Sequence, residues 1–137
     1  MPDVLVDTSI WSLALRREAG GQEDRLVKEL EQLIQETRVR IIGPIRQEIL
    51  SGVKGQKQFE LLKTRLRAFP DLHLTEDIYE RAAEIFNACR KAGVQGSNTD
   101  FLICSAAEQH DVAIFTTDQD FPRYQKYSKF VLHEARK

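Results

Sequence analysis

Short runs of apolar and β-branched residues alternate along the chain with longer stretches whose apolar residues recur at helical spacing. The clearest short runs are residues 4–6, 39–42 and 112–115. Such runs are typical of buried strands in a parallel sheet. Strands that run parallel need long connections between them, usually helical. The alternation therefore predicts an α/β fold with a mainly parallel sheet and helices on both faces.

The stretches at helical spacing set the expected helices. They are residues 10–15, 24–37, 44–50, 56–69, 75–92 and 100–110. Thr75 is expected to cap its helix, and Asn98 or Thr99 the last one, which is apolar on nearly every side and should be buried. Two weaker runs, residues 72–74 and 130–132, bring the expected sheet to about four or five strands.

Length and composition indicate one domain spanning residues 1–137, without repeats or an internal linker. Apolar residues make up 42% of the chain, which is enough for one core. The net charge is −1, so any nucleic-acid contact must rely on local patches or bound cations. Cys89 and Cys104 are expected to be buried, reduced thiols.

The compartment expected from the sequence is the cytoplasm, without membrane contact. Asp3 and Asp7 interrupt any apolar segment near the start, which argues against a secretory signal. The longest uncharged apolar stretch, residues 101–107, is far too short to span a bilayer.

Acidic residues follow two of the expected strands. Asp7 comes directly after residues 4–6, and Asp118 follows residues 112–115 after two threonines. Ligand sites in open α/β sheets form at the carboxyl ends of the strands. The polar neighbours Thr8, Ser9, Thr116 and Thr117 are expected to orient carboxylates or water there.

Two further acids, Glu48 and Asp100, are expected in about the first turn of their helices. In a parallel α/β domain, helix N-termini lie at the same edge as the carboxyl ends of the strands. Each acid alone has an ordinary explanation, as a strand end, a turn residue or a partner of a helix dipole. Together, four carboxylates at one edge without a matching base would repel one another. A divalent cation, Mg²⁺ or Mn²⁺ given oxygen ligands, would remove that cost and suit phosphodiester hydrolysis.

Four segments carry a family resemblance. Residues 6–11 (VDTSIW), 44–50 (PIRQEIL), 98–103 (NTDFLI) and 116–121 (TTDQDF) resemble the PIN domain, in the order and approximate spacing of the VapC-type toxins. The resemblance covers almost the whole chain.

The resemblance implies a three-layer α/β/α, PIN-like fold and an Mg²⁺- or Mn²⁺-dependent endoribonuclease that cuts RNA. It implies that Asp7, Glu48, Asp100 and Asp118 hold the metal and carry catalysis. It also implies a homodimer and a separate antitoxin protein that blocks the site.

Supporting roles are expected for a second group of residues. Asp120 lies two positions after Asp118 and either assists a second metal or water, or only starts the next helix. Thr116 is the expected hydroxyl of the site, Thr8 is a second candidate, and Asn98 is a candidate substrate contact. Candidate contacts to the RNA backbone, or else ordinary surface charges, are Arg16, Arg17, Arg46 and Lys54.

Other functions fit the sequence less well. The Asp118-x-Asp120 spacing superficially fits an aspartate-nucleophile phosphatase, but those enzymes carry the motif near the start of the fold. A phospho-acceptor receiver domain would need a lysine at a strand end, and none is convincing. A PIN-like module that binds RNA or protein without cutting remains an alternative, although it would have no reason to keep four acids.

Overall fold

The computed structural model describes residues 2–16 and 21–137, and within them it has three strands and seven helices. The strands are β1 (Val4–Val6), β2 (Val39–Arg40) and β3 (Ala113–Phe115). The helices are α1 (Thr8–Arg16), α2 (Gly21–Gln35), α3 (Gly43–Leu50), α4 (Gln56–Leu66), α5 (Glu76–Lys91), α6 (Asn98–His110) and α7 (Phe121–Tyr124). None of these helices is both long and apolar enough to cross a bilayer.

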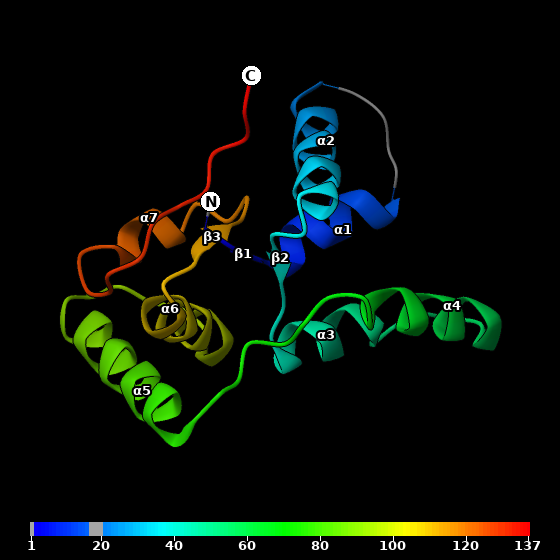
Figure 1. Ribbon diagram of the computed structural model, residues 1–137. Coiled ribbons are helices and arrows are strands. Elements are labelled where there is room, and N and C mark those ends of the chain that lie inside the picture. The colour runs from blue at the N-terminus through cyan, green and yellow to red at the C-terminus, as the bar shows by residue number, and fades with distance from the viewer. Residues whose placement is uncertain (1, 17–20) are drawn as a thin grey trace.

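The sheet is parallel, with β1 at its centre between β2 and β3. Val4 pairs with Val39 on one side and with Ala113 on the other. All three residues of β1 are fully buried, which explains why the run is apolar without alternation. Figure 1 shows α1 and α2 on one side of the strands and α5 and α6 on the other. The predicted α/β class with helices on both faces of a parallel sheet is confirmed.

The strand count is lower than the four or five expected. The two weak runs contribute one parallel bridge each, Ile41 to Asp71 and Ile114 to Leu132. On the first side, Leu72 donates to the Ile41 carbonyl at 2.8 Å. Pro70 has no N–H to donate and α5 is already capped at Thr75, so only a short segment lies between them. The outer segments therefore flank the sheet without extending it as strands.

The helix predictions hold with two corrections. The Thr75 hydroxyl caps α5, and residues 101–107 of α6 are all buried, as expected. The cap of α6 is Ser97, however, and neither Asn98 nor Thr99. The Ser97 hydroxyl accepts a hydrogen bond from the Asp100 amide at 3.0 Å, so the helix begins one residue earlier than a cap at Asn98 would allow. The predicted helices at 24–37 and 56–69 also end early, at Gln35 and Leu66.

The two cysteines lie on α5 and α6, which pack against each other. Cys89 and Cys104 are both buried and both free, as predicted. Burial raises the pKa of each thiol above its ordinary value, so neither is an activated nucleophile.

Side-chain hydrogen bonds to glutamates connect the C-terminal segment to α2 and the residue after it. The Glu29 side chain is 2% exposed, and its Oε2 lies 2.6 Å from His133 Nε2. Arg136 donates from Nε to Glu29 Oε1 at 2.9 Å and from Nη1 to Glu36 Oε2 at 2.8 Å. Burial alone would raise the pKa of Glu29, but the hydrogen bonds from His133 and Arg136 outweigh it and lower that pKa. Hydrogen bonds from Arg136 and Arg38 lower the pKa of Glu36 to about 2.

Replacing Arg136 with alanine should lower the free energy of unfolding at neutral pH, because it leaves the buried Glu29 short of a donor. Both glutamates have lowered pKa values in the fold, so their contribution is present above the ordinary value of 4.5 and is lost as the pH falls through their folded values. The difference between wild type and Arg136→Ala should therefore shrink between pH 5 and about pH 2. Urea unfolding over this pH range measures it, with the exposed neighbour Lys137→Ala as the control. A difference that stays constant with pH would contradict the assignment.

Candidate active site

Asp7 occupies the first position after β1, where the strand leads into α1. Its backbone N–H donates to the Phe115 carbonyl at 2.9 Å, so the pairing of β1 with β3 determines where it lies. The residue is 8% exposed. Its Oδ1 accepts from the Thr8 amide at 2.8 Å, and its Oδ2 accepts from Thr116 Oγ1 at 2.7 Å and from Ser9 Oγ at 3.1 Å. The carboxylate is held from both sides of the β1–β3 junction.

Ionisation of the Asp7 carboxyl group is energetically unfavourable despite these donors. Burial raises its pKa above the ordinary value, and the hydrogen bonds from Thr116, Ser9 and the Thr8 amide offset only part of that rise. The negative charge of Asp100 raises the pKa of Asp7 further.

Asp100 lies in the first turn of α6, as the sequence predicted. Its Oδ2 accepts a hydrogen bond from the Tyr124 hydroxyl at 2.7 Å. Burial raises its pKa, the Tyr124 hydrogen bond opposes the rise, and the negative charge of Asp118 adds to it. The charge of Asp100 thus repels that of Asp7, and the charge of Asp118 repels that of Asp100. We refer to these three residues as the acidic site.

The structure separates the roles of Asp118 and Asp120. The Asp118 amide donates to Thr116 Oγ1 at 3.0 Å, which links it to the hydroxyl that holds Asp7. Asp120 immediately precedes α7, and its carboxylate lies 3.5 Å from Arg123. Its backbone N–H donates to Asp118 Oδ1 at 2.9 Å. This arrangement favours Asp118 as the acid of the site and Asp120 as a residue that starts the next helix.

Glu48 is not brought to the acidic site by any interaction among the described residues. It lies in the second turn of α3, not the first, because that helix already begins at Gly43. The residue is exposed, and its carboxylate has no hydrogen bond or ion pair with another described residue. The expectation of a first-turn position was wrong, and its role as a ligand stays a prediction.

The chemistry of the acidic site fits a hard divalent cation. Its donors are carboxylate oxygens, which such ions prefer, and their mutual repulsion would fall on binding. The Thr8 hydroxyl is buried and has no hydrogen-bond partner among the described residues, so the site has an unused polar atom beside Asp7. Among the described residues, no three acidic, histidine or cysteine side chains lie close enough together to hold a metal ion. Binding would therefore need the carboxylates to draw together.

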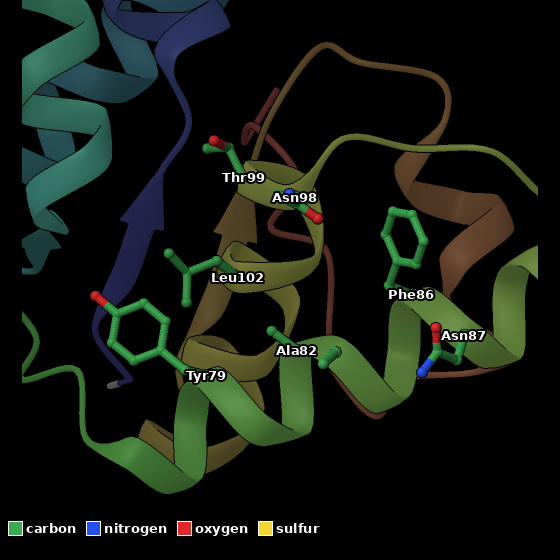
Figure 2. Close-up of a pocket in the computed structure, with 8 residues that line it drawn as sticks. Tyr79, Ala82, Phe86, Asn87, Asn98, Thr99 and Leu102 are labelled. Atoms are coloured by element: carbon green, nitrogen blue, oxygen red, sulfur yellow. The ribbon is translucent and has the colours of Figure 1, made fainter.

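Asn98 lines a groove that includes none of the acidic-site residues. It is exposed at the start of α6 and lines a groove of about 350 Å³ between α5 and α6, together with Tyr79 and Phe86 (Figure 2). No hydrogen bond of its side chain to the acidic site is present in the described structure. Asn98 as a substrate contact therefore stays a prediction.

The basic residues named as candidate RNA contacts differ in their surroundings. Arg46 donates to the carbonyls of Leu66 and Phe69, at 3.0 and 3.1 Å, and pairs with Asp71 at 2.6 Å. Its guanidinium joins α3 to the end of α4, so it is a structural residue. Further basic candidates for RNA are Arg16 and Lys54, which are exposed, and Arg17, which lies outside the described residues.

One residue of the site was missed from the sequence. Tyr124 on α7 reaches Asp100 from the last short helix, and its ring is fully buried. Nothing in its spacing distinguishes it from an ordinary core aromatic, so only the structure identifies the contact.

The fold and the acidic site define a class: an α/β protein with a buried aspartate and two partly exposed ones at the carboxyl edge of a parallel sheet. Residues 4–127 match the family model of the PIN domain, and the chain belongs to the PIN-domain family.

Relatives with known structures or names agree with this assignment. The chain is 32% identical over 123 residues to ribonuclease VapC11 of Mycobacterium tuberculosis, covering 86% of this chain and 88% of that protein. VapBC2 from Rickettsia felis, solved bound to a DNA fragment from its promoter, superposes with a TM-score of 0.74 at 19% identity, covering 95% of this chain and 96% of that chain. A toxin–antitoxin complex from Klebsiella pneumoniae gives a TM-score of 0.67 at 20% identity, covering 87% and 90%. At these identities the two structures show a shared fold.

Replacing Thr116 with valine should lower the free energy of unfolding by about 1–2 kcal/mol, since it removes a donor to the buried Asp7 carboxylate and an acceptor for the Asp118 amide. Thr117→Val is the matched control, because Thr117 is exposed and its hydroxyl bonds to no described residue. Urea unfolding of both variants compares them directly. Equal stabilities would show that Thr116 does not support Asp7.

Proposed function

We propose that the protein is a metal-dependent endoribonuclease, using Mg²⁺ or Mn²⁺, and the toxin of a toxin–antitoxin pair. The observation that carries this proposal is the buried Asp7 carboxylate, coupled to Asp100 and through it to Asp118. Membership in the PIN-domain family and the named ribonuclease among its relatives support it. Cytoplasmic location belongs to the same proposal.

The residues proposed to hold the metal are Asp7, Asp100 and Asp118, with Glu48 as a fourth acid. When bound, a divalent cation supplies the positive charge that a phosphodiester needs to approach these carboxylates, and it activates a water for attack. Thr116 and Ser9 keep both carboxylate oxygens of Asp7 oriented together with the Thr8 amide. The unpaired Thr8 hydroxyl is suited to orient a water or a phosphate oxygen beside Asp7.

An antitoxin is the proposed protein partner, because the solved relatives include toxin–antitoxin complexes. We expect it to contact α2 and α4, where the apolar side chains of Ile34 and Leu61 are exposed. Together with α1 they line an apolar groove of about 550 Å³ that includes Trp11, Leu62 and Phe69. Leu15, which lines this groove, and Leu61, which precedes Leu62, are about half exposed, at 51% and 52%. A homodimer is proposed on the family resemblance alone.

Cleavage of a structured RNA tests the proposal. Wild-type protein should cut the RNA with Mn²⁺ or Mg²⁺ and not with EDTA. Asp7→Asn should lower the rate by at least about a hundredfold, because metal-assisted stabilisation of the transition state is worth several kcal/mol. Asp111→Asn is the matched control. Asp111 caps the opposite end of α6 from Asp100 in a left-handed conformation, with φ of 53°, which asparagine also tolerates.

The outcomes distinguish the two candidate functions. Loss of cleavage in Asp7→Asn with normal cleavage in Asp111→Asn supports the enzyme. RNA binding without cleavage in any metal, unchanged by Asp7→Asn, would overturn it in favour of a non-catalytic binding module. Glu48→Gln in the same assay decides whether that residue belongs to the site, since a surface acid would leave the rate unchanged.

A further inference from the structure

Tyr124 connects the last short helix to the acidic site. It is the final residue of α7, and its hydroxyl lies 2.7 Å from Asp100 Oδ2. Burial raises the pKa of Tyr124, and the hydrogen bond to Asp100 raises it further. The phenol O–H is the donor, and the carboxylate is the acceptor. Hydrogen bonds from Ser97, at the start of α6, also reach the Asp100 carboxyl and lower its pKa.

The Tyr124 ring is fixed from several sides. It is fully buried and contacts Phe101 and Phe121, with ring centroids 4.9 and 5.2 Å apart. Phe101 directly follows Asp100 on α6, so the ring packs against the same turn that carries the carboxylate. The hydroxyl has little freedom to point elsewhere.

Gly96 leaves the space that this contact needs. A Cβ at this position would lie 2.7 Å from Phe101 Cζ and closer still to the Tyr124 hydroxyl. Real Cβ atoms do not tolerate such distances, so a side chain here would displace the tyrosine or the loop. The loop before α6 is therefore shaped around the Tyr124–Asp100 contact.

We propose that Tyr124 is a positioning residue for the divalent cation of the acidic site. It holds Asp100 by Oδ2, so that the carboxylate is oriented before a cation binds. This inference rests on the proposed function, because it assigns Asp100 to the metal. Hydrogen bonds to a ligating carboxylate commonly change metal affinity or activity by about 10–100-fold.

Tyr124→Phe removes only the hydroxyl and keeps the buried ring. Mn²⁺ titrations, followed by the melting temperature of RNA-free protein, should show a half-saturating Mn²⁺ concentration about tenfold above that of wild type. Tyr127→Phe is the matched control, since Tyr127 is half-buried nearby and its hydroxyl bonds to no described residue. It should titrate like wild type. Cleavage by Tyr124→Phe should recover to within about threefold of wild type at saturating Mn²⁺, because the hydroxyl acts through affinity.

A purely structural role gives a different result. It would lower the melting temperature of Tyr124→Phe equally with and without Mn²⁺ and leave the titration midpoint within about twofold of wild type. That result would overturn the proposal, as would an equal shift in Tyr127→Phe or a wild type that binds no Mn²⁺. Gly96→Ala is a second variant, which should weaken Mn²⁺ binding in the same direction with the hydroxyl still present. Failure of the nuclease assignment shows separately, as a wild type that binds Mn²⁺ and cuts no RNA.

Discussion

The buried carboxylate of Asp7 is the constraint around which this end of the molecule is arranged. A charged group that is 8% exposed is costly unless donors surround it, and here an amide and two hydroxyls do so. Those donors come from the start of α1 and from the loop after β3. They can meet only because β1 and β3 pair in parallel and end at the same edge. The residual repulsion from Asp100 is what a divalent cation would relieve.

The central features of the fold and the site could be predicted from local patterns. Unbroken apolar runs identify strands buried on both faces, and a polar residue at the carboxyl end of such a strand reaches the sheet edge by topology alone. Asp7 and Asp118 follow from that rule, and Asp100 follows from the apolar helix that it opens. Thr75 is recognisable as a cap because its helix begins immediately after it.

The features that sequence reasoning missed depend on contacts between distant segments. The outer edges of the sheet form single bridges, and at Asp71 the room is limited because α4 ends at Leu66 and α5 begins at Glu76. Glu48 lies in the second turn of α3, because that helix begins at Gly43, one residue before the predicted start. Tyr124 meets Asp100 across 24 positions of the chain, and no local spacing encodes such a contact. The family resemblance, and not the physics of the residues, supplied the step from a metal site to a ribonuclease.

The central claim is that Asp7, Asp100 and Asp118 share one divalent cation. Anomalous scattering from a crystal of the protein containing Mn²⁺, recorded at the manganese absorption edge, tests it most directly. The account predicts one strong peak within coordination distance of carboxylate oxygens from Asp7 and at least one of the other two aspartates. A well-ordered site with no peak there, or manganese bound only elsewhere on the molecule, would contradict it.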